Sequence, residues 1–281
     1  MHMVNEYATP LAAGPVVVKY GGNAMTSGRP EGAQPEPDPV LSEIAQLWAA
    51  GTRVVLVHGG GPEIDRALAQ RGISTERIAG MRVTDAGTLD TTEAVLCGTL
   101  NKRLVRACTT LGIPCAGISG EDGGTLVAEK LRPENGADLG YVGDVVACDP
   151  KLIRALLEAG FLPVVAPLAI AVDAAHAYNV NADLAAAAIA GALKASAFIL
   201  VTNVDRVRRD LADPTSGIDR LTLDEARAFA ASEACDGGMK PKMAASIEAV
   251  RAGALASYIT RAATDGLSKA IRFGDATVIA P

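Results

Sequence analysis

The chain has 281 residues, a little under two domains' worth at roughly 150 residues per domain. Hydrophobic residues make up 49% of it and charged residues 21%, which excludes a wholly disordered chain. The formal net charge is -6, with 26 Lys and Arg against 32 Asp and Glu. This balance argues against a general nucleic-acid binder, because such proteins need a basic surface, so no nucleic-acid partner is expected.

Neither a membrane segment nor a secretion signal is expected. The most apolar stretch, residues 184–202, is rich in alanine and contains Lys194, which predicts a buried helix and a core strand. The first residues show no basic region followed by a long apolar region. The five cysteines form no CxxC pair, which favours reduced thiols in a cytoplasmic protein over a disulfide or a metal site.

Strands and helices are predicted to alternate along nearly the whole chain. In the first half, strands are predicted at 15–19, 53–57, 115–119, 125–130, 140–147 and 162–167, and helices at 39–50, 62–72, 88–111 and 150–160. In the second half, helices begin at 182, 221 and about 240, and strands lie at 197–202, 256–260 and 276–280. This order predicts an α/β fold with a mainly parallel sheet, in which ligands bind beyond the carboxyl ends of the strands.

Two boundaries of the first predicted helix are marked by their residue types. Asp38 is a suitable N-cap, Pro39 suits the first helical position, and Gly51 follows the last apolar residue. Residues 29–39 contain four prolines and are predicted to form a surface loop. Residues 125–130 and 140–147 are predicted to form a hairpin.

Glycine-rich turns follow the first two predicted strands. KYGGNAM, from Lys19, places a cation beside two glycines, which suits either a phosphate site or a tight turn with a surface lysine. VHGGGP, from Val57, opens a helix whose free N–H groups favour an anion. Neither turn has the GxGxxG or GxxxxGK[ST] spacing, which disfavours a dinucleotide site and a Walker P-loop. His58 is more readily a core residue than a catalytic base.

Three further polar segments are candidates for a site. Arg82, in AGMRVTD, suits bidentate recognition of a carboxylate, although a solvent-exposed arginine is the alternative. In YNVNAD, the side chains of Asn179, Asn181 and Asp183 alternate and would share one side of an extended segment, whereas Asp183 could equally be a helix N-cap.

The third segment, DGGMKPKM, places Lys240 and Lys242 at the start of a helix. Cations are not electrostatically favoured there, which suggests that the two lysines hold an anion between them. A flexible loop with two solvated lysines is the alternative.

In this order, K-x-G-G, G-x-R-V-T, N-V-N-A-D and G-M-x-x-K resemble the amino acid kinase family, most closely its members that phosphorylate N-acetylglutamate. The resemblance runs from about Val16 to the end of the chain. It implies a three-layer αβα sandwich around a mainly parallel sheet, in two lobes. Residues 1–172 are expected to bind the acylated amino acid and form a dimer, and residues 173–281 to bind ATP.

The resemblance also implies roles for individual residues. Lys19 and Lys242 would contact the transferred phosphoryl group, and Asp183 would hold both lysines in place. The acceptor would be bound by Arg82 and Asn179 through its α-carboxylate, with Asn181 beside them, and by backbone N–H groups of Gly59 and Gly60. The nucleotide would be bound by Gly21, Gly22, Thr202, Asn203, Asp205, Gly238 and Met239, with backbone N–H groups offered by the two glycines that follow Lys19.

The implied reaction transfers phosphate from ATP to the γ-carboxylate of N-acetyl-L-glutamate, a step of arginine biosynthesis. That carboxylate is already ionised at neutral pH, so the reaction needs no general base. It needs neutralisation of charge as two anions approach, which lysines and N–H donors supply. Mg²⁺ is expected to arrive with ATP, held by phosphates and water, and no metal site is expected in the chain.

Departures from the family pattern leave the acceptor open. Asn203 and Arg206 stand where the family more often has T-D-V-D-G-V, and Lys240 replaces an aliphatic residue. CGTLNKRLV and GISGEDGG resemble a sister kinase that acts on aminoadipate or glutamate attached to a carrier protein. The third hypothesis is a non-catalytic regulatory relative. The presence of Lys19, Asp183 and Lys242 argues against it. Because only about fifteen residues precede the first predicted strand, a homodimer insensitive to arginine is expected.

Overall fold

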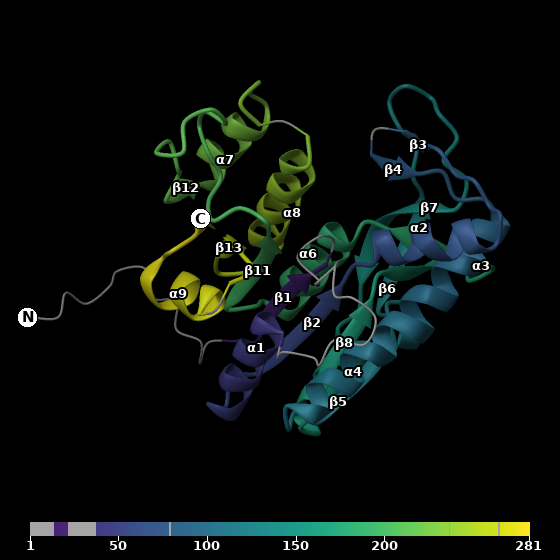
Figure 1. The fold of residues 1–281 in the computed structure, drawn as a ribbon, viewed down its shortest axis with the longest axis horizontal. Helices are drawn as coiled ribbons and strands as arrows, with labels where there is room; N and C mark the ends of the chain where they lie inside the picture. Colours follow the sequence, from purple (N-terminus) through teal and green to yellow (C-terminus); the bar gives the residue numbers. More distant parts are fainter. Residues whose placement is uncertain (1–13, 22–37, 79, 236, 264) are drawn as a thin grey trace, which may run out of the picture.

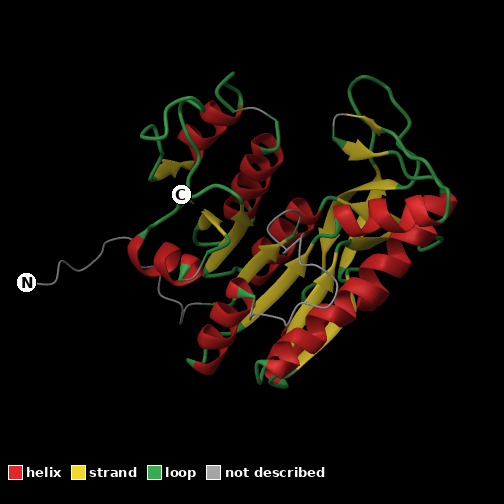
Figure 2. Cartoon of the chain, viewed as in Figure 1, coloured by secondary structure: helices red, strands yellow, loops and turns green. Residues whose placement is uncertain are grey.

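The structure is a computed structural model that describes residues 14–21, 38–78, 80–235, 237–263 and 265–281. Within these residues, eight strands form one sheet, in the order β12-β14-β13-β11-β1-β2-β8-β5 (Figures 1 and 2). All neighbouring strands in it are parallel except β13 and β14. The predicted mainly parallel sheet is confirmed. Its strands are β1 (Val16–Tyr20), β2 (Val54–His58), β5 (Cys115–Ser119), β8 (Leu162–Ala166), β11 (Ala197–Thr202), β12 (Arg220–Thr222), β13 (Ser257–Arg261) and β14 (Thr277–Ala280).

Helices cover both faces of this sheet, which gives the predicted three layers (Figure 1). The first strand shows why both faces are apolar: Val17 packs into one core, and Val16 and Val18 pack into the other. The first core contains residues of α5 (Lys151–Glu158), α6 (Ala182–Leu193), α7 (Leu223–Ala230) and α8 (Met239–Arg251). The second contains residues of α1 (Pro39–Ala49), α2 (Gly61–Gln70), α4 (Asn101–Thr110) and α9 (Gly266–Phe273).

A small four-stranded barrel stands beside the main sheet. It contains β6 (Leu126–Lys130), β7 (Val142–Cys148), β9 (Leu168–Ala171) and β10 (Ala177–Val180). The first two strands pair antiparallel, so the hairpin predicted there is confirmed. The predicted boundary between residues 172 and 173 lies in the turn between β9 and β10, which pair with each other. The division into two lobes at that point therefore stays a proposal.

The long helical stretch predicted over residues 88–111 is confirmed as helical, but it is not one regular α-helix. The chain forms α3 (Ala86–Glu93), a π-helix (Ala94–Leu100) and then α4, and the backbone N–H of Asn101 donates to the carbonyl of Leu96. Leucines at helical spacing could not reveal this change of hydrogen-bond pattern, because the apolar face continues through it. The short elements β12, β3 (Arg77–Ile78), β4 (Met81–Arg82) and a 3₁₀ turn (Asp122–Gly124) were too short for periodicity to predict.

The predicted start of the first helix is confirmed. Asp38 caps α1, because its Oδ1 accepts hydrogen bonds from the N–H groups of Val40 and Leu41. The five cysteines are all free thiols; Cys108 and Cys235 are buried. No helix within the described ranges is both long and apolar enough to cross a membrane. Most of the proline-rich segment 29–39 lies outside the described residues.

Candidate active site

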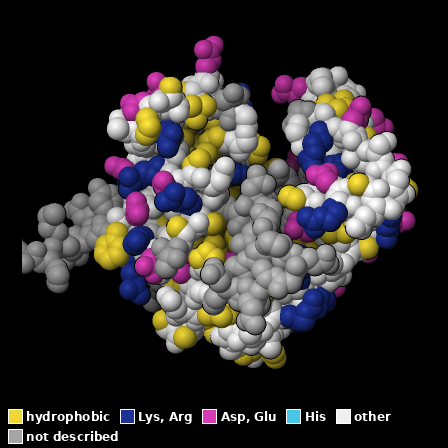
Figure 3. Space-filling model, in the orientation of Figure 1, with side chains coloured by type: hydrophobic (Ala, Val, Ile, Leu, Met, Phe, Trp, Pro, Cys, Tyr) yellow, Lys and Arg dark blue, Asp and Glu magenta, His cyan; other side chains and the backbone are white. Residues whose placement is uncertain are grey.

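A cavity of about 630 Å³ lies where the carboxyl ends of β1 and β2 meet the β3–β4 hairpin, β10 and the starts of α6 and α8. On the face drawn in Figure 3, the molecule is hollowed between the mass over α7 and α8 and the mass over the β3–β4 hairpin. Predicted residues from distant parts of the chain line this one cavity: Lys19, Gly59, Gly60, Arg82, Asn179, Asn181, Asp183 and Lys242.

Two lysines share one buried carboxylate in the cavity. The Nζ of Lys19 lies 2.8 Å from Oδ1 of Asp183, and the Nζ of Lys242 lies 3.1 Å from Oδ2. The side chain of Asp183 is only 7% exposed. Burial alone would raise the pKa of Asp183, but the two ammonium groups outweigh burial and hold this pKa below its ordinary value. Asp183 is therefore ionised at neutral pH and fixes both lysines.

The start of α6 places Asp183 under the lysines. Asn181 is the N-cap of this helix, since its Oδ1 accepts from the N–H groups of Asp183 and Leu184 at 2.8 and 3.2 Å. The alternative prediction that Asp183 itself is the N-cap is therefore wrong. The strand β10 ends at Val180, and the Oδ1 of Asn181 is used within the first turn of the helix.

The two glycine turns pack directly against each other. A Cβ on Gly21 would lie 2.7 Å from the backbone N and 2.9 Å from the Cα of Gly59, so only glycine fits there. The expectation that Gly59 offers its N–H to a ligand is wrong, because that N–H donates to the carbonyl of Tyr20 at 3.0 Å. Gly60 is the N-cap of α2, and no side chain caps this helix. Gly22 lies outside the described residues.

Arg82 is held by partners that the sequence did not single out. It is 6% exposed and forms an ion pair with Asp65 of α2, and its Nη1 donates to Thr75 at 3.2 Å. Asp65 also pairs with Arg77, the partner of Arg82 in the β3–β4 hairpin, at 3.1 Å. Burial raises the pKa of Asp65, but the two guanidinium groups lower it further than burial raises it. The solvent-exposed alternative for Arg82 is wrong.

The polar wall near Arg82 includes Asn179. Its Nδ2 donates to the hydroxyl of Thr84 at 3.4 Å, and that hydroxyl donates to the carbonyl of Arg82 at 2.9 Å. Asp65, Arg77 and Thr84 carried no signal in the sequence beyond their residue type. Their roles depend on contacts between α2, the hairpin and β10, and spacing along the chain does not report such contacts.

None of the residues predicted for the nucleotide that the structure describes lines this cavity. Thr202 is buried at the carboxyl end of β11, where its hydroxyl bonds to the backbone of Val204. The carboxylate of Asp205 pairs with Arg261 at 2.7 Å. Asn203 and Gly238 are exposed, and Met239 is half-buried at the first residue of α8. Of the two lysines at that helix start, Lys242 pairs with Asp183, whereas Lys240 is exposed. The anion beside Lys242 is therefore a carboxylate of the chain itself, and not a ligand held between the two lysines.

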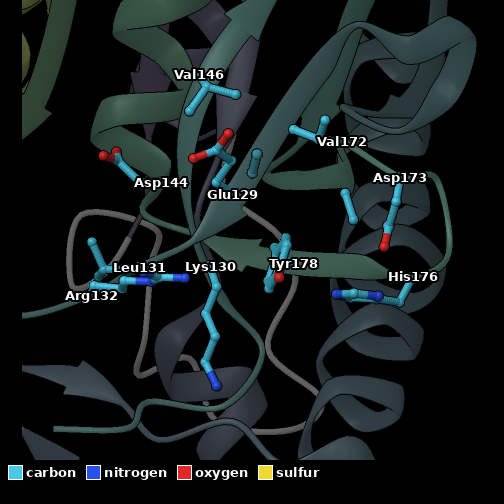
Figure 4. Close-up of a pocket in the computed structure, with 12 residues that line it drawn as sticks. Glu129, Lys130, Leu131, Arg132, Asp144, Val146, Val172, Asp173, His176 and Tyr178 are labelled. Carbon is cyan, nitrogen blue, oxygen red and sulfur yellow. The ribbon is translucent and has the colours of Figure 1, made fainter.

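A second cavity, of about 680 Å³, lies over the small barrel and contains none of the predicted site residues. In the view of Figure 4, Glu129 and Asp144 lie on one side of it, and Lys130 and Arg132 on the other. This mixture of charges favours no single ligand chemistry. In the described part of the chain, no group of three or more His, Cys, Asp or Glu residues gathers in a way that could hold a metal ion.

Comparison with known proteins identifies the family. The model of the amino acid kinase family matches residues 14–261. The chain belongs to this family. It is 38% identical over 261 residues to the acetylglutamate kinase of Heliobacterium modesticaldum, covering 90% of this chain and 86% of that one. The acetylglutamate kinase of a Thermoanaerobacter species is 40% identical over 253 residues, which cover 90% and 82% of the two chains.

The fold recurs in solved structures. N-acetylglutamate synthase from Neisseria gonorrhoeae, solved with coenzyme A and N-acetylglutamate, superposes with a TM-score of 0.77 at 23% identity. The match covers 95% of this chain and 59% of the synthase chain, so this chain corresponds to part of that protein. The predicted amino acid kinase fold is confirmed.

Proposed function

We propose that the protein is an acetylglutamate kinase, which phosphorylates the γ-carboxylate of N-acetyl-L-glutamate with ATP to form an acyl phosphate. The observation that carries this proposal is the ionised Asp183 between Lys19 and Lys242, in a cavity that also contains the buried Arg82. The similarity to acetylglutamate kinases over 90% of the chain supports the choice of acceptor.

The geometry supplies what transfer between two anions requires. Lys19 and Lys242 are held at fixed positions by one carboxylate, so their charges face the transferred group without reorganisation. The acceptor is an ionised carboxylate, so its oxygen attacks phosphorus without loss of a proton, and the bond to ADP breaks in line. Arg82 would bind the α-carboxylate of the acceptor, and this carboxylate would share or replace Asp65 as its partner.

ATP would enter from the side of residues 173–281, near Thr202, Asn203, Asp205, Gly238 and Met239. Gly21 and Gly22 would contact its phosphates. Mg²⁺ would arrive with the nucleotide, bound to phosphate oxygens and water, because it keeps most of its hydration and needs few protein ligands. The lobe division and a cytoplasmic location stay predictions.

The test is a coupled assay of ADP release with three free acceptors: N-acetylglutamate, N-acetylaminoadipate and aspartate. We expect turnover with N-acetylglutamate, and trapping of the product with hydroxylamine should give the hydroxamate of an acyl phosphate. Turnover only with aminoadipate or glutamate attached to a carrier protein would reject the free amino acid as acceptor. ATP binding without any turnover would favour a non-catalytic regulatory protein.

We also propose that the enzyme is a homodimer whose activity is insensitive to arginine. Light scattering coupled to size exclusion should give the mass of a dimer, twice 28.7 kDa. The rate of ADP release should be the same with and without millimolar arginine. A hexamer, or inhibition by arginine, would overturn this proposal.

A further inference from the structure

A buried polar pair lies directly beneath the glycine turn of the active site. His58 is the last residue of β2, Asn101 is the first residue of α4, and both are 0% exposed. The Nε2 of His58 lies 3.3 Å from Nδ2 of Asn101, and its Nδ1 lies 3.0 Å from the carbonyl oxygen of Gly59. Because His58 has no exposed surface, it does not reach the reacting atoms as a base. Its contacts instead connect the core to the turn.

The surroundings of Asn101 decide which way its amide faces. Its Nδ2 lies 2.9 Å from the carbonyl of Val164 and 3.3 Å from that of Ile118, and both of these groups only accept. Its Oδ1 lies 3.1 Å from the ammonium group of Lys102, which only donates. The amide nitrogen is therefore the atom that faces the imidazole of His58, and its two N–H groups are shared among three acceptors.

This orientation fixes the tautomer of His58. Facing a donor, Nε2 must accept, so the single proton of the neutral ring lies on Nδ1. Burial lowers the pKa of His58 to about 4, so the ring is neutral at physiological pH. The Nδ1–H group then donates to the carbonyl of Gly59, the acceptor that lies 3.0 Å away.

That hydrogen bond orients the next peptide bond. In a trans peptide, the carbonyl of one residue and the N–H of the next point in opposite directions. With the Gly59 carbonyl drawn toward His58, the N–H of Gly60 points away from the core, and Gly60 lines the cavity that contains Lys19. Among the described residues, the N–H of Gly60 has no hydrogen-bond acceptor.

We propose that His58, held as its Nδ1–H tautomer by Asn101, is a positioning residue that aims the Gly60 N–H at the transferred phosphoryl group. This inference rests on the proposed kinase function. A donor aimed at developing negative charge lowers the barrier without strengthening the ground-state complex to the same extent. Loss of the positioning contact should therefore lower kcat more than it raises KM.

Three substitutions separate positioning from packing. His58→Asn places an amide N–H near the position of Nδ1–H, His58→Gln extends its amide toward Nε2, and His58→Leu removes every donor. We expect kcat with N-acetylglutamate to fall about 10- to 100-fold in His58→Leu and His58→Gln, with less than a threefold change in KM. His58→Asn should recover most of the lost kcat. Equal kcat values in all three variants, whether retained or lost, would overturn the proposal.

A spectroscopic test uses the wild-type protein and needs no turnover. In protein labelled with ¹⁵N-histidine, the two-bond ¹H–¹⁵N correlation pattern of the imidazole reports which nitrogen carries the proton. The chain has three histidines, and the spectrum of His58→Asn assigns the ring of His58 by difference. We expect the Nδ1–H pattern, and an Nε2–H pattern would overturn the proposal. Failure of the proposed function would instead appear as absence of turnover in the wild type.

Discussion

At the scale of single residues, the active site is organised around one carboxylate. Asp183 pairs with two ammonium groups through its two oxygens, which fixes both lysines inside the cavity. The sequence motifs pointed to these three residues through their resemblance to a family. Asp65 and Asn101 could not be found in the same way, because their partners lie on other elements and only the folded chain brings them together.

The first prediction concerns Asp183→Asn. The substitution leaves Lys19 buried without a counter-charge, which should cost about 3 kcal/mol of stability and lower Tm by roughly 5–10 °C. The lysines should also lose their positions, and kcat/KM should fall at least about 100-fold. ADP release and thermal unfolding are the measurements. Asp224→Asn is the matched control, because Asp224 is 92% exposed and its pair with Arg227 contributes little. Equal losses in both variants would contradict the assignment.

The second prediction concerns acid stability. The pKa of His58 is lowered from 6.5 to about 4, mainly because burial disfavours the charged ring; the hydrogen bond to Gly59 opposes this shift and the nearby charge of Lys102 adds to it. The unfolded chain therefore binds more protons than the folded chain below pH 6.5. The stabilising contribution of His58 is fully present above that pH and is lost as the pH falls toward 4, by about 3 kcal/mol in total.

Urea unfolding at several pH values between 8 and 4 measures this contribution. The slope of stability against pH should be shallower in His58→Asn than in the wild type. His176→Asn, which keeps His58, should retain the wild-type slope in this window. The lowered pKa of Asp183 acts in a separate window, below its ordinary value of 3.8. An unchanged slope in His58→Asn would refute the assignment to His58.

At the scale of elements, the site is built where strands end and helices begin. The patterns predicted these strands and helices well, because apolar runs and capping residues are local signals. The β3–β4 hairpin has strands of two residues and was not predicted, although it contributes Arg77 and Arg82 to the site. Asp65 in α2 pairs with both arginines, a contact that no local pattern encodes.

The third prediction tests the close approach of β1 and β2. In Gly21→Ala, the new methyl group would meet backbone atoms of Gly59 at 2.7 and 2.9 Å, so the ends of both strands must move apart. We expect a loss of about 1–3 kcal/mol in stability and at least a tenfold loss in kcat/KM. Gly87→Ala is the control, since its Cβ would meet its nearest atoms at 3.9 and 4.0 Å. Wild-type activity in Gly21→Ala would show that the approach is not needed.

At the scale of the whole molecule, one buried carboxylate connects helices from the two halves of the chain. Glu43 of α1 accepts hydrogen bonds from the N–H groups of Leu267 and Ser268 at 3.2 and 2.9 Å, at the start of α9. Glu43 is 2% exposed. The N-cap residue of α9, Asp265, makes no side-chain hydrogen bond to this helix end. A helix near residue 45 is thereby fixed to one near residue 270.

The fourth prediction is that Glu43→Ala weakens this connection. Two buried N–H donors would lose their acceptor, which should cost about 1–3 kcal/mol, and Tm should fall by several degrees. Differential scanning calorimetry measures both the midpoint and whether the halves still unfold in one transition. Glu248→Ala, which removes an exposed pair with Arg251, should leave Tm within about 2 °C of the wild type. A similar small change in Glu43→Ala would show that the cap contributes little.

The π-helix between α3 and α4 determines the direction in which the side chains of α4 face. Each residue of an α-helix turns the chain by about 100°, so deletion of one residue from Ala94–Leu100 would rotate α4 by roughly that angle about its axis. Asn101 would then face away from His58 while the composition of the helix stayed nearly the same. The wider helical turn thus aligns Asn101 with His58. Through this contact, α4 helps to hold the glycine turn of the active site in place.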